Sequence, residues 1–268
     1  MPYDPLNAGP GRIHICGHRG HSIGAPENTV PAIVEAARRG ATVCEIDIVL
    51  TADDALVLLH DEVVDRTTNG KGRAAALTLA EVRALDAGAW FSPAFAGTRV
   101  PTLGEALDAA KGAGVGLLVE IKERQRPDRL IDRLAGVLAD HEALEEVLVI
   151  SFDHPSLVAA QRRIPGLRTE LITHARHVDP VEMARRAGAA SVAIEADMFH
   201  PDDARALRAA GVATRVTVPR PERIALRRAA GLDPLARVNE GLAADVIDVL
   251  AGDDVTAVVA LAQAKGKG

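Results

Sequence analysis

Large aromatic side chains are scarce in this sequence, which has one Trp, one Tyr and four Phe in 268 residues. Apolar residues nevertheless make up 48% of the chain, so its core must be built mainly from Ala, Val, Leu and Ile. Cysteine is equally scarce. Cys16 and Cys44 fall in two segments with strand character but with opposite parity, so no disulfide is expected between them. Two reduced, buried thiols are typical of a cytoplasmic protein.

Long apolar runs and an excess of basic residues are also missing. No stretch reaches the roughly 18 apolar residues of a membrane-spanning helix, and the first segment, "MPYDPLNAGPGRIH", lacks the apolar core of a signal peptide. A cytoplasmic location is therefore expected. The formal net charge of −6 argues against a nucleic-acid-binding protein, although a small phosphorylated ligand needs only a few local cations. The absence of a GxxxxGK[ST] motif gives no support to nucleotide binding through a P-loop.

Short apolar runs alternate with segments of helical periodicity along most of the chain. Segments such as 30–40, 102–114 and 202–211 have apolar residues at helical spacing and end in Gly. This alternation predicts a single (β/α)8 TIM barrel domain over residues 1–268, with an open doubly wound sheet as the competing architecture. The expected strands are residues 12–17, 42–50, 115–122, 147–151, 168–173, 191–196, 213–218 and 245–250.

The region after the second strand interrupts this alternation. From His60 to Pro101 the sequence is too long for a simple loop and too irregular for one helix, and it holds the only Trp and two of the four Phe. We interpret approximately residues 61–101 as a small inserted subdomain that folds over the end of the barrel.

Carboxylates occur in two of the expected strands. In "CEIDI", Glu45 and Asp47 are two residues apart and therefore point to the same face of a strand. In "LLVEIK", Glu120 and Lys122 share a face in the same way. Three carboxylates near the C-terminal ends of adjacent strands are suited to one hard divalent cation, Mg²⁺ or Ca²⁺, with Mn²⁺ as a further possibility. The alternative is a buried ion-pair cluster, but one lysine cannot neutralise three acids.

Two histidines and two further cations are expected at the same rim. His18 follows the first strand and His60 follows the apolar run "ALVLL", where each could simply be a polar residue at a strand end. Beside a metal, two imidazoles are suited to general acid and base catalysis. Arg19 and Lys122 are suited to binding a phosphate. The lack of a three-histidine or cysteine-containing cluster near the acids argues against a typical zinc site.

Several motifs together resemble those of the glycerophosphodiester phosphodiesterase family. They are "GHRG", "APENT", "EIDIVLTADDALVLLHD", "RTTNGKG", "LDAGAWFSPAFAGTRVPTLGEAL", "VEIK" and "VISFD", in family order between Gly17 and Asp153. The resemblance implies a phosphodiesterase barrel with a small subdomain after the second strand. It also implies an acid/base pair (His18 and His60), metal ligands (Glu45, Asp47 and Glu120), phosphate-binding cations (Arg19 and Lys122) and an apolar pocket wall (Phe152).

The loop "GHRGHSIGAPENT" contains further polar residues. Asn28 or Thr29 is expected to cap the following helix, and Glu27 to tie the loop to its neighbours. The alternative is that Glu27 and Asn28 contact the metal or the ligand. His21 is not part of the pattern, and we expect it to be exposed to solvent rather than to bind substrate.

The C-terminal third departs from the family pattern. The seventh expected strand reads "TRVTV" where the family carries a Trp, and "IDVLAGDD" stands where a Thr-Asp-x-Pro motif is expected. Arg215 either points inward, where a third cation would favour a second negative group on the substrate, or points outward and pairs with a helix. The remaining histidines are interpreted as surface or core polar residues: His14, His141, His154, His174, His177 and His200.

The resemblance implies metal-dependent hydrolysis of a small glycerophosphodiester to glycerol 3-phosphate and an alcohol. The nucleophile is either water or the neighbouring glycerol hydroxyl, through a cyclic phosphate. Two alternatives stand beside this prediction: a lysophospholipase D-like enzyme, which an apolar pocket mouth would favour, and a barrel that binds phosphodiesters without catalysis. No nucleic-acid partner and no membrane span are expected, and the oligomeric state does not follow from the sequence.

Overall fold

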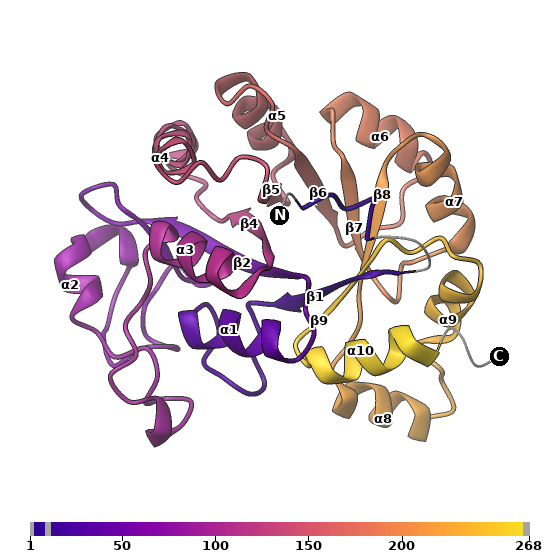
Figure 1. Cartoon of the computed structure of the whole chain (residues 1–268), viewed down its shortest axis with the longest axis horizontal. Coiled ribbons are helices and arrows are strands. Elements are labelled where there is room, and N and C mark those ends of the chain that lie inside the picture. The colour runs from indigo at the N-terminus through magenta and orange to yellow at the C-terminus, as the bar shows by residue number, and fades with distance from the viewer. Residues whose placement is uncertain (1–2, 9–11, 265–268) are drawn as a thin grey trace.

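In the computed structural model, which describes residues 3–8 and 12–264, eight parallel strands close into a barrel surrounded by helices (Figure 1). Closure occurs at β1, which pairs with β2 on one side and with β9 on the other. The predicted (β/α)8 barrel is therefore confirmed. The barrel strands are β1 (His14–His18), β2 (Val43–Leu50), β4 (Gly116–Ile121), β5 (Val147–Ser151), β6 (Thr169–Thr173), β7 (Ser191–Glu195), β8 (Ala213–Thr217) and β9 (Val249–Gly252).

The last barrel strand lies further along the chain than the sequence suggested. The prediction was residues 245–250, whereas β9 spans Val249–Gly252. Val246 and Ile247 pack in the layer between the sheet and the helices, and the Asp248 carboxylate forms an ion pair with Arg208. The apolar residues that predicted the start of the strand therefore belong to the connection that leads into it.

Helices connect successive barrel strands, and hydroxyl side chains cap several of them. Thr29 accepts a hydrogen bond from Ala32 N at the start of α1, so this residue, rather than Asn28, is the cap. Thr102 and Glu105 form a capping box at the start of α3. The helices outside the insertion are α1 (Val30–Arg38), α3 (Leu103–Ala113), α4 (Pro127–Asp140), α5 (His154–Arg163), α6 (Pro180–Ala187), α7 (Pro201–Ala209), α8 (Pro221–Ala229), α9 (Ala236–Ala243) and α10 (Val255–Gln263).

The segment between β2 and α3 has elements and a core of its own. Strand β3 (Leu56–Leu58) runs antiparallel to the end of β2, followed by η1 (Ala74–Ala76), α2 (Leu79–Arg83) and η2 (Pro93–Phe95). These elements extend to the left of the barrel in Figure 1. A separate apolar cluster holds them together: Val49, Val57, Leu59, Val64, Ala74, Val82, Ala87 and Val100. The segment is therefore anchored to the C-terminal end of β2, close to the carboxylates of that strand.

Two apolar layers support the barrel. The larger lies between the strands and the helices and contains Cys44, whereas Cys16 belongs to a smaller interior cluster with Leu118, Leu148 and Ile150. Both cysteines are buried and free, as their opposite parity predicted. The interior cluster closes one part of the barrel, so polar side chains on the same strands gather beyond it, towards the C-terminal ends.

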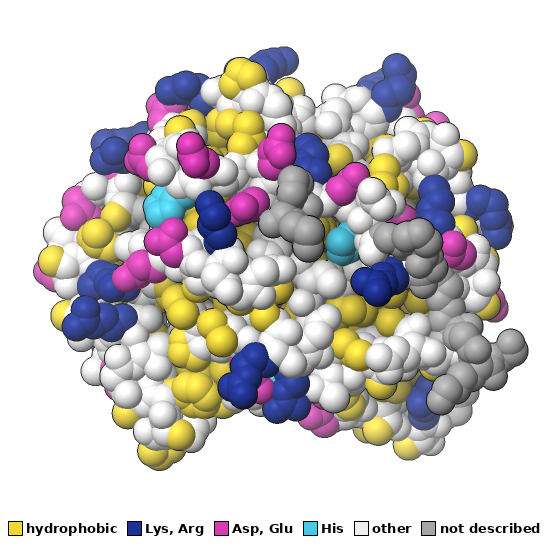
Figure 2. Space-filling view, viewed as in Figure 1, with side chains coloured by type: hydrophobic (Ala, Val, Ile, Leu, Met, Phe, Trp, Pro, Cys, Tyr) yellow, Lys and Arg dark blue, Asp and Glu magenta, His cyan; other side chains and the backbone are white. Residues whose placement is uncertain are grey.

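The face shown in Figure 2 carries lysine and arginine side chains that are dispersed among acidic ones and do not form one basic patch. Within the described residues, no helix combines the length and the apolar character needed to cross a membrane.

Candidate active site

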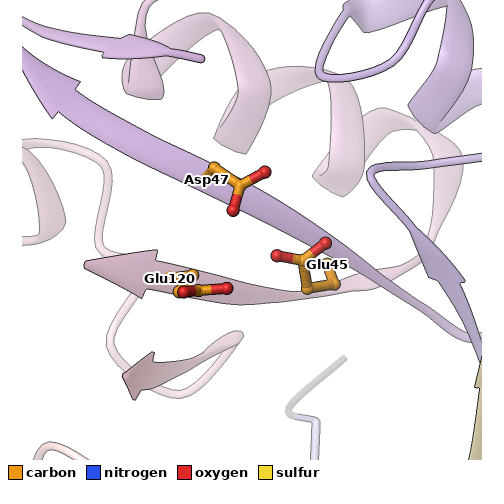
Figure 3. A group of neighbouring side chains, drawn as sticks. All are labelled: Glu45, Asp47 and Glu120. Carbon is orange, nitrogen blue, oxygen red and sulfur yellow. The ribbon is translucent and has the colours of Figure 1, made fainter. Parts of the chain in front are cut away.

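Three carboxylates from two adjacent strands lie together at the C-terminal side of the barrel (Figure 3). Glu45 and Asp47 come from β2 and Glu120 comes from β4, where the strand register places Asp47 directly opposite Glu120. One ligand atom from each residue lies within 4.8 Å of those of the other two. Strand alternation and register thus bring the predicted ligands into one cluster.

Burial makes this cluster costly unless a cation joins it. Glu45 and Asp47 are almost fully buried, and Glu45 Oε1 accepts no hydrogen bond from any described residue. Burial and the nearby Asp47 raise the pKa of Glu45 to about 7. Burial and Asp47 also raise the pKa of Glu120. Because all the donors are carboxylate oxygens, the cluster fits one Mg²⁺ or Ca²⁺ ion.

Two cationic side chains contact the carboxylate cluster. Lys122 Nζ lies 2.7 Å from Glu120 Oε1 and 3.1 Å from Asp47 Oδ1, and Arg19 Nε lies 3.5 Å from Asp47 Oδ2. Burial lowers the pKa of Lys122, but the charges of Asp47 and Glu120 outweigh it and raise the pKa above its usual value. When all three acids are ionised, as they would be around a bound metal, three carboxylates against two cations leave one negative charge in excess. A dication would turn this excess into one positive charge, which matches the single negative charge of a phosphodiester.

His18 is held at the edge of the cluster by a carboxylate from the other end of the chain. Its Nδ1 donates to Asp253 Oδ1 over 2.5 Å, and Asp253 also pairs with Arg220. Burial lowers the pKa of His18, but the Asp253 hydrogen bond and the charge of Glu45 outweigh it, so the pKa is raised. With Nδ1 occupied, Nε2 is the nitrogen left for proton transfer, and it lies 3.9 Å from Glu45 Oε2.

His60 is oriented in a similar way, but by the aspartate that directly follows it in the sequence. Its Nδ1 donates to Asp61 Oδ1 over 2.7 Å, which again leaves Nε2 available. Here burial lowers the pKa of the imidazole below its usual value, although Asp47 and the Asp61 hydrogen bond act against it. The two imidazoles of the site therefore have pKa values shifted in opposite directions, a pattern that suits an acid/base pair.

Arg66, from the segment between β2 and α3, links the loops of both histidines. Its guanidinium donates two hydrogen bonds of 2.8 Å to Glu27, and two of 2.7 and 3.2 Å to Asp61. Glu27 in turn accepts from Arg19 Nη1 over 2.8 Å. The Arg66 hydrogen bond is the main reason why the pKa of Asp61 falls to about 2. Glu27 therefore ties its loop to its neighbours, as expected from the sequence.

Replacement of Arg66 with Lys is expected to lower kcat/KM by about 10- to 100-fold, as for other residues that orient catalytic ligands. Lysine cannot form both bidentate pairs, so Asp61 and His60 lose their fixed orientation. In Arg66→Ala, the unshielded charge of Asp61 raises the pKa of His60, and the limb of the pH profile of kcat/KM that reports His60 moves to higher pH. An unchanged profile and unchanged kcat/KM in both variants would contradict this role.

Asn28 and His21, in the loop of residues 17–29 that also contains His18 and Glu27, form hydrogen bonds that hold other parts of the structure. Asn28 Nδ2 donates to Asp47 Oδ2 over 2.7 Å, and its Oδ1 accepts from Asp47 N, so it orients a carboxylate of the cluster. The expectation that His21 is exposed was wrong, because only 3% of it is accessible. Its Nδ1 accepts a hydrogen bond from Val255 N at the first turn of α10, and this backbone group would otherwise lack a helical partner.

A pocket of about 260 Å³ opens over the cluster. The predicted residues His18, Arg19, Glu45, His60, Glu120, Lys122 and Phe152 line it, while Asp47 is buried beside it. The opposite wall comes from the ends of β6, β7 and β8 and combines polar with apolar side chains: Ile172, Thr173, His174, Ala193, Ile194, Glu195, Arg215 and Thr217.

Arg215 points inward, but a carboxylate already neutralises its charge. It is 3% exposed, and both Nε and Nη2 lie 2.8 Å from Glu170 Oε1. Burial lowers the pKa of Arg215, but Glu170 outweighs this effect and raises it. Ser191 donates to the other carboxylate oxygen, so Glu170 is fully engaged. Arg215 therefore points inward, but it does not provide the unpaired third cation that was expected to favour a second negative group on the substrate.

Replacement of Arg215 with Ala is expected to destabilise the fold by about 3–5 kcal/mol, because it leaves the buried Glu170 carboxylate without its partner. The double variant Arg215→Leu with Glu170→Leu is expected to lose far less, since both charges are removed together. Urea unfolding of the three proteins measures these free energies. Equal losses in the single and the double variant would show that the pair does not act as a unit.

Several residues of the site could not be identified from the sequence. Asp253 lies 235 residues from His18, and only closure of the barrel between β1 and β9 brings the two together. The "DD" at 253–254, just after the last strand, was the only signal. His174 was interpreted as a surface or core polar residue but lines the pocket, and Glu195 was not singled out at all.

Comparisons with known proteins agree with this geometry. Residues 18–237 match the Glycerophosphoryl diester phosphodiesterase family. The chain is 37% identical over 188 residues to a glycerophosphodiester phosphodiesterase of Caldanaerobacter subterraneus subsp. tengcongensis, covering 70% of this chain and 74% of that protein. It is 34% identical over 183 residues to a glycerophosphodiester phosphodiesterase of Bacillus subtilis, covering 63% of this chain and 62% of that protein.

A solved structure resembles almost the whole chain. An Oleispira antarctica phosphodiesterase in complex with the product sn-glycerol-3-phosphate superposes with a TM-score of 0.81 at 27% identity, covering 93% of this chain and 96% of that one. The family match spans most of the barrel and includes the three carboxylates together with Arg19 and Lys122. The chain belongs to the glycerophosphoryl diester phosphodiesterase family.

Proposed function

We propose that this protein hydrolyses glycerophosphodiesters to glycerol 3-phosphate and an alcohol, with one divalent cation as cofactor. The observation that carries the proposal is the arrangement of two imidazoles, each oriented through Nδ1 by an aspartate, beside three buried carboxylates in one pocket. The bound sn-glycerol-3-phosphate of the Oleispira antarctica phosphodiesterase supports the same reaction class.

Each side chain has a distinct task in this proposal. Glu45, Asp47 and Glu120 would hold Mg²⁺ or Ca²⁺, which supplies positive charge next to the phosphate oxygens. Arg19 and Lys122 line the pocket and neutralise the phosphate further. One of His18 and His60 accepts through Nε2 a proton from the nucleophile, which is water or the neighbouring glycerol hydroxyl; in the second case water then opens the cyclic phosphate to glycerol 3-phosphate. The other donates a proton to the oxygen of the leaving alcohol.

The composition of the pocket favours small deacylated substrates over lysolipids. The apolar residues Phe152, Ile172, Ala193 and Ile194 share the lining with charged or polar ones such as Glu195, Arg215 and Thr217, so the pocket is of mixed rather than predominantly apolar character. The intact set of acids, cations and imidazoles favours catalysis over mere binding of phosphodiesters.

A substrate panel tests the proposal. Glycerophosphocholine, glycerophosphoethanolamine, glycerophosphoglycerol and lysolipids are each incubated with the protein and Mg²⁺ or Ca²⁺. Glycerol 3-phosphate from the deacylated diesters is measured with a coupled dehydrogenase, and hydrolysis of the lysolipids is measured as release of their free alcohol. We expect release from the deacylated diesters. Turnover of lysolipids alone would instead identify a lysophospholipase D-like enzyme, and binding without turnover would identify a non-catalytic barrel.

A further inference from the structure

Three residues at the ends of adjacent strands form a strip on the pocket wall. Phe152 directly follows β5, His174 directly follows β6, and Glu195 is the last residue of β7; these strands are neighbours in the barrel (Figure 1). The rings of Phe152 and His174 lie 4.5 Å apart with 31° between their planes. His174 Nδ1 lies 3.1 Å from Glu195 Oε1. The Phe152 ring, the His174 ring and the Glu195 carboxylate are therefore in contact, one after the other, along the wall.

The Glu195 carboxylate of the strip forms no ion pair with a lysine or arginine among the described residues. Arg215, which lines the same wall, is engaged by Glu170. Within the described part of the chain, the recorded ion-pair partner of Glu195 is His174 alone. More than half of the Glu195 side chain is exposed, so a ligand in the pocket can reach it.

The position of the strip in the pocket indicates which of the two alcohol groups of a bound diester it would contact. The carboxylates that would hold the metal, and the cations that would bind the phosphate, lie on or directly after β1, β2 and β4, whereas the strip begins beside β4, at the end of β5, and continues to β7. A diester bound there has two alcohol substituents, and the pocket extends from the phosphate side to the strip. The hydroxyls of glycerol match the polar phosphate side, which leaves the strip for the second alcohol.

A carboxylate next to aromatic faces is the chemistry that binds ammonium groups in proteins. We propose that Glu195, Phe152 and His174 form the subsite for the leaving alcohol and select alcohols that bear an ammonium group, such as choline or ethanolamine. This inference rests on the proposed function. It also reverses the expectation that an inward Arg215 would favour a second negative group, because Glu170 neutralises that arginine.

An adjoining cavity of about 230 Å³ could instead bind an alcohol that carries a second negative group. It shares His18, Glu195 and Thr217 with the pocket and contains three arginines. Arg220 pairs with Asp253 and Arg227 with Asp197, whereas Arg223 has no recorded ion pair among the described residues. An alcohol with a second negative group would use Arg223, which makes this residue the matched comparison for Glu195.

The test compares kcat/KM for glycerophosphocholine with that for glycerophosphoglycerol, whose leaving alcohol is uncharged. The wild-type protein is expected to favour the choline diester, and Glu195→Gln to lower that preference by roughly three- to tenfold. Phe152→Leu keeps an apolar wall without a ring face and is expected to lower the preference as well. Arg223→Gln is expected to retain the wild-type preference.

The outcomes separate this inference from the proposed function. If the wild-type protein hydrolyses neither diester, the proposed function fails. If it hydrolyses both and Glu195→Gln leaves the ratio unchanged, the subsite is refuted while the function stands. A preference for a diester with an additional phosphate, lost in Arg223→Gln, would also overturn the subsite. Thermal unfolding of each variant shows that a changed ratio comes from folded protein.

Discussion

Replacement of His18 or His60 with Ala is expected to lower kcat by about 10²- to 10⁴-fold, the usual contribution of one general acid or base. In the proposed mechanism each imidazole is oriented through Nδ1 and transfers one proton through Nε2, so each variant removes one of the two proton transfers. Steady-state rates with a glycerophosphodiester give the loss directly. The double variant is expected to lose little more than the worse single variant, because residues that act as a unit are not additive.

Metal binding is the control for these variants, because both substitutions leave the carboxylate cluster intact. Addition of Mg²⁺ should raise the melting temperature of the wild-type protein, His18→Ala and His60→Ala by similar amounts, since an ion that binds only the folded state stabilises it. Near-normal turnover in both variants, with this metal-dependent stabilisation retained, would refute the acid/base assignment.

Removal of divalent cations is expected to abolish activity, and addition of Mg²⁺, Ca²⁺ or Mn²⁺ is expected to restore it. Without a cation, the three acids exceed Lys122 and Arg19 by one negative charge, which opposes the binding of an anionic diester. Oxygen ligands select hard cations but discriminate weakly among them. Activity measured after exhaustive treatment with EDTA, and again after each ion is added, checks the prediction.

Glu45→Gln offers a second test of the same cluster. The amide keeps the size of the side chain but removes one negative charge, so the metal concentration needed for half-maximal activity should rise by about 10-fold or more. Glu240→Gln, a change in α9 outside the pocket, is the matched control. Full activity after EDTA treatment, or equal metal requirements for Glu45→Gln and the control, would mean that the cluster does not hold a catalytic ion.

Local periodicity was enough to predict the barrel and the carboxylate cluster. Glu45 and Asp47 share a face because strand side chains alternate, and that rule needs no knowledge of the rest of the chain. The same rule could not decide whether Arg215 points inward, since its neighbours in "TRVTV" carry no clear alternation. The partner that settled the matter, Glu170, lies on another strand 45 residues away.

Several residues that orient the site reach their partners only because the barrel closes, and local sequence patterns do not predict such long-range contacts. Asp253 reaches His18 because β9 pairs with β1, and His21 is buried because α10 begins against its ring. Arg66 lies in an irregular segment where no periodicity predicts the direction of a side chain. Such contacts are set by tertiary packing, whereas the residues proposed to touch the metal and phosphate stand in short motifs.

The central claim is tested most directly by ³¹P NMR of glycerophosphoethanolamine incubated with the wild-type protein and Mg²⁺. The account predicts that the diester resonance disappears and is replaced by one monoester resonance, that of glycerol 3-phosphate. The account is contradicted if the diester persists with Mg²⁺, Ca²⁺ and Mn²⁺ alike, or if the phosphate is released on ethanolamine instead of glycerol.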